Sequence, residues 1–276
     1  MTSKNNFLRE EIAESLHNGG IKSPMCESVG RFAQNSVALL LEAHQQLLQD
    51  DVWKKFIKKN GAWTSGENPR LKETALSADL ARNAQELLEA EGTSYAPHIE
   101  TVGAGLSFDV FSISCVVADE GFVTDELTGS NSPRADIVFH PAVPELKIRF
   151  SAEAKIVESE ADVTGKLFGP EGLGCYTRFD NPYQTSGAVW LLAYSDASYI
   201  GSAMACIEDH MTGHDDFSKS RRAGYVVDEA TVSLLDAVCA DVMPGIPSFC
   251  FASAFSFPVM RKNKKSQPNR RALKAK

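Results

Sequence analysis

The sequence predicts an α/β fold built on a mixed β-sheet, with a helical segment before it. A helical run at residues 71–92 is followed by three strand-like runs, one at residues 107–117 and two within residues 133–157. Helix, strand, strand, strand is an order that suits a mixed sheet better than a doubly wound one. The chain has 276 residues, of which 43% are hydrophobic, so it can bury a sizeable core in one domain or two.

Composition favours a soluble, cytoplasmic protein with no membrane partner. No apolar run approaches the roughly 20 residues that a membrane-spanning helix needs. The N-terminal sequence MTSKNNFLREE lacks the apolar stretch of a secretory signal. Six cysteines are spread singly, without a CxxC pair, and we expect them to be reduced thiols rather than disulfides or zinc ligands.

Charge divides the chain into an acidic body and a basic tail. Residues 261–276, RKNKKSQPNRRALKAK, hold eight Lys or Arg and no acid. Removing these eight positive charges from the net charge of −8 leaves −16 on the rest of the chain. The tail is either a solvated, disordered terminus or a segment that contacts phosphate. An acidic body also suggests that substrate binding requires a protein partner or a homo-oligomer.

The first 65 residues form the predicted N-terminal helical segment. Residues 7–18 and 27–60 are expected to be helical, separated by Gly19 and Gly20, and residues 61–70 form a loop rich in helix breakers. Apolar positions in the second helix recur mostly every three or four residues: Phe32, Val37, Leu40, Leu41, His44, Leu47 and Leu48. This segment carries no recognisable chemistry, and packing, partner contact and substrate positioning all remain open.

The helix at residues 71–92 begins the second predicted unit, which spans residues 66–260. Glu73 lies near its start, where a carboxylate is usually no more than a favourable partner of the helix dipole. Gly92 ends the helix. The next run, SFDVFSISCVV at residues 107–117, is rich in β-branched and aromatic residues and is predicted to be a strand.

Residues 133–157 carry the residues around which we expect the site to form. Two strands are predicted there, separated by a turn at residues 141–144 that proline brackets at both ends. Because side chains alternate along a strand, Glu153 and Lys155 share one face, opposite the apolar residues. In the preceding strand the Asp136 side chain is on the face opposite to that of Ile137 and Phe139. If the two strands pair antiparallel, the Asp136 carboxylate can therefore meet Glu153. Two carboxylates beside a lysine suit a hard cation and phosphate chemistry.

Four further elements are predicted downstream. GAVWLLAYS at residues 187–195 has the composition of a buried strand, and residues 197–211 that of an amphipathic helix. A second helix is expected at about residues 229–242. A final strand is predicted at residues 247–259, where aromatic and small residues alternate.

Asp136 followed by Glu153-Ala154-Lys155 resembles the signature of the PD-(D/E)XK nuclease superfamily. The resemblance covers PRAD and EAK, and Ala135 stands where the usual proline precedes the aspartate. The position of Glu73 on a preceding helix is similar to that of an additional metal-site carboxylate in some members. The resemblance implies a restriction-endonuclease-like fold, a mixed β-sheet core flanked by helices, for residues 66–260.

The resemblance also implies roles for these residues. Asp136 and Glu153 would be the principal ligands of Mg²⁺, or of Mn²⁺ as an alternative, with the Ala154 carbonyl and Glu73 as further contacts. Lys155 would orient the attacking water or stabilise charge in the transition state. The products would carry a 5′-phosphate and a 3′-hydroxyl. The isolated motif is also explained by an ordinary Glu-Lys pair on a sheet surface.

The downstream segment GLGCYTRF adds candidates for nucleic-acid binding. Together with the strand GAVWLLAY after it, this segment resembles the glycine-rich, arginine-bearing loop and glycine-led strand of bacterial defence-associated or restriction-like nucleases of this superfamily. Arg178 suits bidentate phosphate contacts, although a structural arginine is an equal reading. Gly172 and Gly174 would permit close approach of a strand, or merely loop flexibility. Gln184 is a weaker candidate, for the metal-water network or a base.

Competing motifs are weaker. His210, His214, Asp215 and Asp216 lack the HExxH pattern of a zinc site and are better explained by a polar helix end. The glycines between residues 169 and 174 do not precede GK[ST], and no Gly-x-Ser-x-Gly elbow is present.

The sequence therefore predicts a metal-dependent endonuclease that hydrolyses phosphodiester bonds of DNA, in defence against foreign DNA such as that of viruses. DNA and RNA are not distinguished by these residues. The alternative is a nuclease-like subunit that binds nucleic acid or a protein partner without cutting it.

Overall fold

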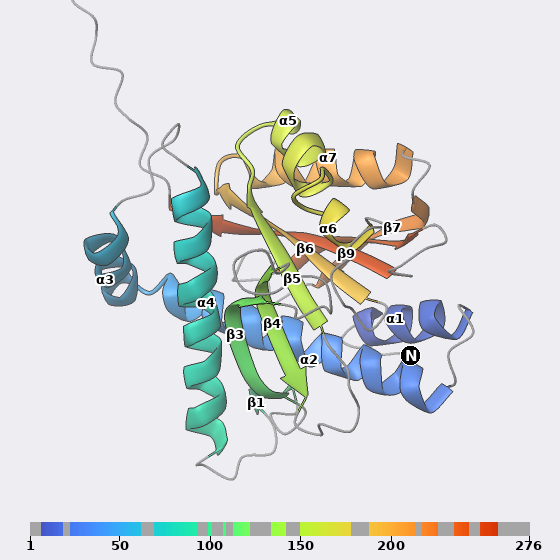
Figure 1. Cartoon of the computed structure of the whole chain (residues 1–276), viewed down its shortest axis with the longest axis horizontal. Coiled ribbons are helices and arrows are strands. Elements are labelled where there is room, and N and C mark those ends of the chain that lie inside the picture. The colour runs from blue at the N-terminus through green and yellow to red at the C-terminus, as the bar shows by residue number, and fades with distance from the viewer. Residues whose placement is uncertain are drawn as a thin grey trace, which may run out of the picture.

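The computed structural model describes residues 7–18, 23–61, 69–92, 99–100, 107–108, 113–121, 134–141, 150–177, 188–213, 217–225, 235–242 and 249–258. These residues form a mixed α/β structure whose centre is a β-sheet with helices on both faces (Figure 1). The α/β class predicted from the order of elements is confirmed at this level.

Four helices come first along the chain: α1 (Phe7–Asn18), α2 (Ser23–Leu47), α3 (Asp50–Asn60) and α4 (Pro69–Gly92). The single long helix expected at residues 27–60 is two helices, and the chain changes direction after Leu47. Gln49 is extended there (φ −61°, ψ 138°), and Asp50 and Asp51 occupy the first turn of α3, where they favour the helix dipole. The helix predicted at residues 71–92 is confirmed, with two more residues at its start.

Strands β1 (Ile99–Glu100) and β2 (Ser107–Phe108) pair by themselves. The main sheet has the order β3-β4-β5-β6-β9-β8-β7. Its members are β3 (Ile113–Gly121), β4 (Arg134–Pro141), β5 (Phe150–Ile156), β6 (Ala188–Asp196), β7 (Phe217–Tyr225), β8 (Leu235–Val242) and β9 (Phe249–Phe257). β5, β6 and β9 run parallel to one another at the centre, and antiparallel strands flank them on both sides.

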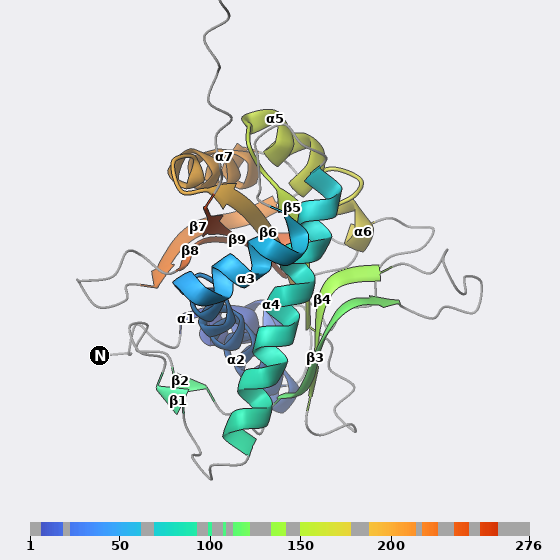
Figure 2. The ribbon, with the colours of Figure 1, turned by 90° about the vertical axis from the view of Figure 1, so that its left-hand side faces the viewer.

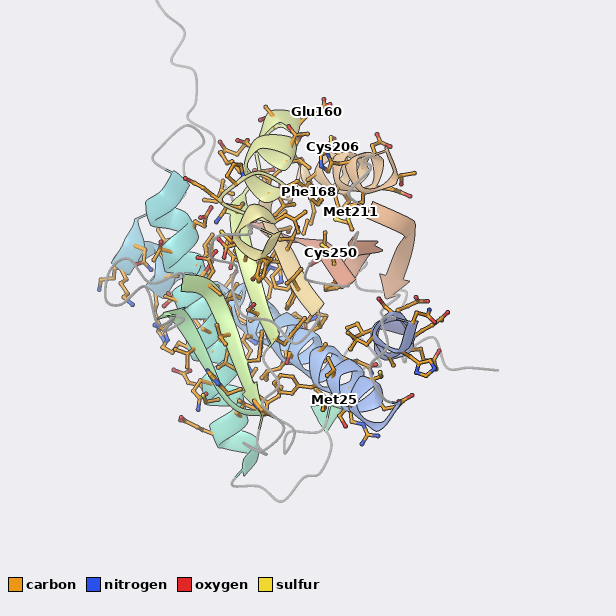
Figure 3. The ribbon with its side chains drawn as sticks, turned by 45° about the vertical axis from the view of Figure 1, so that its right-hand side comes forward. Met25, Glu160, Phe168, Cys206, Met211 and Cys250 are labelled. Atoms are coloured by element: carbon orange, nitrogen blue, oxygen red, sulfur yellow. The ribbon has the colours of Figure 1, made fainter. Side chains whose placement is uncertain are left out.

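Alternation along the central strands gives the sheet two different apolar faces. Trp190, Tyr194 and Phe255 belong to the face that packs on the first four helices, which is rich in aromatic residues. The opposite face uses smaller residues and packs on the π-helical turn η5 (Val163–Leu167), α6 (Gly174–Thr177) and α7 (Ile200–Gly213). The short helix α5 (Glu160–Asp162) leads into η5 and has no buried residue. Phe168, Cys206, Met211 and Cys250 lie on this second side (Figure 3).

α4 lies along the antiparallel half of the sheet, beside β3 and β4 (Figure 2). It also contacts β5, and the Gln85 Oε1 atom accepts a hydrogen bond from the Val116 N–H of edge strand β3 at 2.9 Å. The start of α4 is thereby placed beside β5, where the site lies.

One predicted element is wrong. Residues 235–242, expected in a helix at about 229–242, form strand β8, which pairs antiparallel with both β7 and β9. The sequence LDAVCADV has no strong preference of its own, so pairing on both sides decides its conformation. Residues 229–234 lie outside the described part of the chain. The charged sequence FSKSRRAGY of strand β7 does not indicate a strand.

The strands expected at residues 187–195 and 247–259 and the helix expected at 197–211 are confirmed as β6, β9 and α7. The strand expected at 107–117 is represented by β2 and the start of β3, and residues 109–112 are not described. No described helix combines the length and apolarity needed to cross a membrane. Cys26, Cys115, Cys175, Cys206 and Cys250 form no disulfides.

Candidate active site

Strand register brings Asp136 to Glu153, as the alternation of side chains predicts. β4 and β5 pair antiparallel with Ile137 opposite Ala152 and Phe139 opposite Phe150. One further step of this register places Asp136 opposite Glu153. The described backbone pairing ends at Ile137 and Ala152, and β5 continues beyond it toward Ile156.

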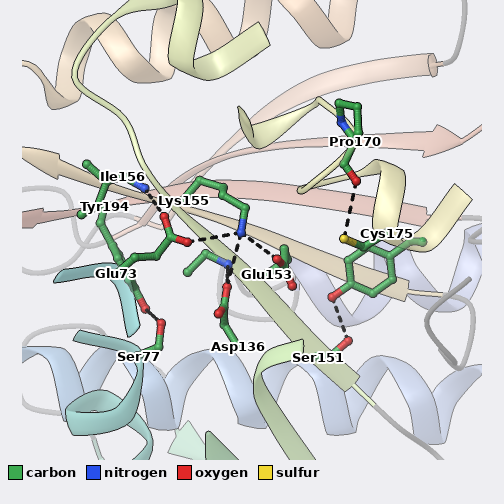
Figure 4. A network of polar contacts seen from close by, with 12 residues as sticks. Glu73, Ser77, Asp136, Ser151, Glu153, Lys155, Ile156, Pro170, Cys175 and Tyr194 are labelled. Carbon is green, nitrogen blue, oxygen red and sulfur yellow. Dashed lines mark hydrogen bonds and ion pairs between the residues drawn. The ribbon is translucent and has the colours of Figure 1, made fainter. Parts of the chain in front are cut away.

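Two carboxylates accept backbone hydrogen bonds from this further part of β5. Asp136 Oδ2 accepts a hydrogen bond from the Ala154 N–H at 2.8 Å, and Glu73 Oε2 accepts one from the Ile156 N–H at 2.9 Å (Figure 4). Buried backbone donors need such partners, since an unpaired one costs free energy comparable to a lost hydrogen bond. Glu73 is therefore more than a partner of its helix dipole, because it joins the start of α4 to the sheet.

Lys155 lies among three carboxylates from three different elements. Its Nζ atom is 2.7 Å from Glu153 Oε1, 3.4 Å from Glu73 Oε1 and 3.7 Å from Asp136 Oδ2. The Lys155 and Glu153 side chains are only 9% and 5% exposed, whereas that of Asp136 is 23% exposed. The four predicted residues thus converge on one point, and the Asp136 side is its more open side.

Burial and charge shift the pKa values at this point. Burial raises the pKa of Glu153 well above its ordinary 4.5, and Asp136 raises it further, while Lys155 opposes the shift. Burial also raises the pKa of Glu73, against the attraction of Lys155. Burial alone would lower the pKa of Lys155, but the surrounding carboxylates outweigh it and raise the pKa, so the ammonium keeps its proton.

One atom of the site has no partner among the described residues. Glu153 Oε2 is buried and accepts no hydrogen bond, although Oε1 of the same carboxylate is held by Lys155. A buried, unsatisfied carboxylate oxygen is costly and requires an explanation. A bound cation that prefers oxygen ligands would satisfy it, and the donor set fits a hard divalent ion in kind.

The arrangement itself is not that of a formed metal centre. Within the described ranges, no three His, Cys, Asp or Glu side chains are placed together so that they could hold a metal ion. The Lys155 ammonium instead stands between the three carboxylates. Ala154 contributes its N–H to the site, and its carbonyl as a metal ligand stays a prediction.

Sequence reasoning missed a second layer behind Glu73. Ser77, one turn further along α4, hydrogen-bonds through Oγ to the Tyr194 hydroxyl of β6 at 2.9 Å, and both residues are buried. Tyr194 is also the register partner of Ile156, whose N–H holds Glu73. Burial raises the pKa of Tyr194 well above its ordinary 10.0, so its hydroxyl stays protonated and able to donate.

Of the predicted nucleic-acid contacts, Arg178 and Gln184 lie outside the described residues. Gly172 is buried, and a Cβ atom there would lie 2.0 Å from the Leu167 carbonyl oxygen, so close packing within the loop requires its glycine. Gly174 is partly exposed and begins α6. Nucleic-acid contacts at Arg178, Gln184, Gly172 and Gly174 stay predictions.

The Tyr176 and Ser151 hydroxyls are hydrogen-bonded at 3.0 Å, which joins α6 to β5 on the face that carries Glu153.

The histidine motif is a helix end as far as it is described. His210 lies in the last turn of α7, where its ring stacks on Phe168 with centroids 4.3 Å apart. His214, Asp215 and Asp216 are outside the described residues.

The chain was compared with protein-family models, curated proteins and solved structures, and none of them matches it.

Proposed function

We propose that this protein is a metal-dependent endonuclease that hydrolyses phosphodiester bonds of DNA, with Mg²⁺ as its cofactor and Mn²⁺ as a substitute, and that it acts against foreign DNA. The observation that carries the proposal is the convergence of Asp136, Glu153, Lys155 and Glu73, drawn from β4, β5 and α4. A purely structural ion pair needs one carboxylate for one lysine, and this point has three.

The resemblance to PD-(D/E)XK nucleases supports the same function. The order of α4, β3, β4 and β5 places the motif acids on neighbouring antiparallel strands, with a helical glutamate beside them. β6 then returns parallel to β5. We therefore propose a restriction-endonuclease-like core for residues 66–260, with the motif beginning PRAD in place of the usual proline-aspartate pair.

Each residue would have a distinct part in the chemistry. Asp136 and Glu153 would hold Mg²⁺, with Glu73 as a third carboxylate; the ion would supply charge neutralisation at the scissile phosphate and lower the pKa of water. Lys155 would donate to a phosphate oxygen as negative charge develops on it. A water oxygen bonds to phosphorus and the bond to the 3′ oxygen breaks, leaving a 5′-phosphate and a 3′-hydroxyl.

The test is cleavage of supercoiled plasmid by the full chain with Mg²⁺ and with EDTA. We expect nicking with Mg²⁺ only, and a loss of at least about 100-fold in Lys155→Ala, in keeping with the removal of a group that stabilises transition-state charge. Lys54→Ala is the matched control, since Lys54 is an exposed α3 residue that pairs with Asp50 of the same helix. Equal rates for wild type and Lys155→Ala would contradict the mechanism.

A non-cleaving nuclease-like subunit is the second candidate, and one observation favours it. Asp136 and Glu73 already accept backbone N–H groups of β5, so a structural need explains part of their presence. This alternative predicts no cleavage with any divalent ion and DNA binding that is unchanged in Lys155→Ala. It leaves the buried Glu153 Oε2 atom unexplained.

A further inference from the structure

The position of Lys155 relative to the three carboxylates bears on how the site would accept a metal ion. Its ammonium contacts oxygen atoms of Glu153, Glu73 and Asp136 at distances between 2.7 and 3.7 Å. Those are the residues proposed as metal ligands. One protein cation thus stands among the same carboxylates that a divalent cation would have to reach.

Charge makes the two cations competitors. Three ionised carboxylates and one ammonium give the cluster a formal charge of −2, and without the ammonium it would be −3. A divalent ion placed among the same oxygens would repel the ammonium at short range, in a site with little water to screen the repulsion. This repulsion favours withdrawal of the ammonium from the carboxylates when a divalent ion binds them.

The cluster has one partly exposed side, toward which the Lys155 ammonium can move. The Asp136 side chain is 23% exposed, so the cluster opens on the β4 side, and a lysine has a flexible stem of four carbons. The proposed function requires a phosphate to reach this site, and the exposed Asp136 side is where the cluster meets solvent. An ammonium that moves there would leave the carboxylates and meet the substrate.

We propose that Lys155 is a tethered cation that holds the carboxylates together in the metal-free protein, yields its place to the divalent ion, and then binds the substrate phosphate. This inference rests on the proposed function, because it concerns the regulation of the same site. It accounts for the absence of a formed three-ligand group among the described residues. It also makes metal binding and phosphate binding mutually favourable, because each stabilises the withdrawn ammonium.

The first experiment measures Mn²⁺ binding by isothermal titration calorimetry, using the full-length chain as wild type, Lys155→Met and Lys155→Arg. We expect Lys155→Met to bind Mn²⁺ at least about tenfold more tightly, because the competing charge is gone. Lys155→Arg keeps the positive charge, so its affinity for Mn²⁺ should be equal to that of the wild type or lower. Lys54→Met, at an exposed position of α3, is the control for loss of a surface charge.

The coupling to phosphate is measured in the same titration. Inorganic phosphate should tighten Mn²⁺ binding to wild type and have a smaller effect on Lys155→Met. Equal or weaker Mn²⁺ binding by Lys155→Met would overturn the inference while leaving the metal site itself intact. Failure of both proteins to bind Mn²⁺ would overturn the inference and the metal-dependent function together.

A measurement on the wild type covers the case in which Lys155→Met does not fold. Amine-reactive labelling, read by mass spectrometry, reports how far each lysine is accessible. The rate at Lys155, which is 9% exposed, should rise when Mg²⁺ is added, relative to the rate at Lys166, which is 40% exposed. A rate at Lys155 that stays constant or falls at saturating Mg²⁺ would contradict the displacement.

Discussion

At the scale of single residues, the buried carboxyl of Glu153 makes stability depend on pH. Folding raises its pKa above the ordinary 4.5, so the folded state binds this proton more tightly than the unfolded state does. Stability therefore falls as the pH rises above 4.5, until the pH passes the folded pKa. The loss amounts to at most about 1.4 kcal/mol per pH unit.

Glu153→Gln should remove this dependence while its amide oxygen still accepts from Lys155. We expect urea denaturation of the metal-free protein to show similar stability for the two proteins near pH 4.5 and a growing advantage for Glu153→Gln toward pH 8. Glu160→Gln, at an exposed position, is the control. Parallel pH profiles for wild type and Glu153→Gln would show that folding does not raise the pKa of this carboxyl.

The motif residues could be predicted from the sequence because strand alternation is local. The alternation of residues 146–156 sets Glu153 and Lys155 on one face, and it requires no knowledge of the rest of the fold. Asp136 needed one further assumption, the antiparallel pairing with β5, which the register confirms. Ser77 and Tyr194 could not be found in this way. They lie 117 positions apart, and in the sequence they look like a helix serine and a core tyrosine.

At the scale of elements, two bonds fix the start of α4 on the sheet. Glu73 and Ser77 lie one turn apart on α4 and bond to Ile156 and Tyr194, which are register partners on β5 and β6. Tyr194→Phe leaves the buried Ser77 hydroxyl without this partner. The expected cost is about 1–3 kcal/mol of unfolding free energy.

The hydrogen bond from the Ile156 N–H to Glu73 reports whether the Ser77–Tyr194 pair positions Glu73 or only stabilises the fold. The Ile156 amide, which Glu73 protects, should exchange its hydrogen faster in Tyr194→Phe than in wild type, measured by NMR. Ser77→Ala/Tyr194→Phe, which removes both hydroxyls, should recover part of the stability, because no buried group is left unsatisfied. Unchanged protection of Ile156 would show that Glu73 is held without help from this pair.

The helix expected at residues 229–242 shows where local reasoning fails at this scale. Ala237 and Ala240 of β8 lie opposite Ser253 and Cys250 of β9, and β7 pairs on the other side. Both neighbours are close along the chain, but the charged sequence of β7 does not indicate a strand, so the pairing on that side cannot be predicted from composition. Composition alone could not outweigh the hydrogen bonds that two neighbouring strands supply.

At the scale of the whole molecule, the N-terminal helices share one core with the sheet. His44 of α2 donates through Nε2 to the Ser256 carbonyl at 2.9 Å and stacks on Phe255, with ring centroids 4.5 Å apart. Burial lowers the pKa of His44 to about 4, against the effect of that hydrogen bond, so the ring is uncharged at neutral pH. Trp53 of α3 stacks on Phe257, with centroids 6.0 Å apart.

A chain of residues 66–276 should therefore not unfold cooperatively, because its sheet would expose the aromatic face that α1, α2 and α3 cover. Thermal unfolding of this shortened chain and of the full-length chain, both monitored by circular dichroism, measures the difference in cooperativity. A sharp transition in the shortened chain would show that the boundary near residue 65 separates units that fold independently.

The most direct test of the central claim is a crystal structure of the full-length protein with Mn²⁺, using anomalous scattering to locate the ion. We predict an anomalous peak at Asp136 and Glu153, with carboxylate oxygens as ligands and the Lys155 ammonium withdrawn from both carboxylates. Saturating Mn²⁺ that gives no peak there, with Lys155 still bonded to Glu153, would contradict the account.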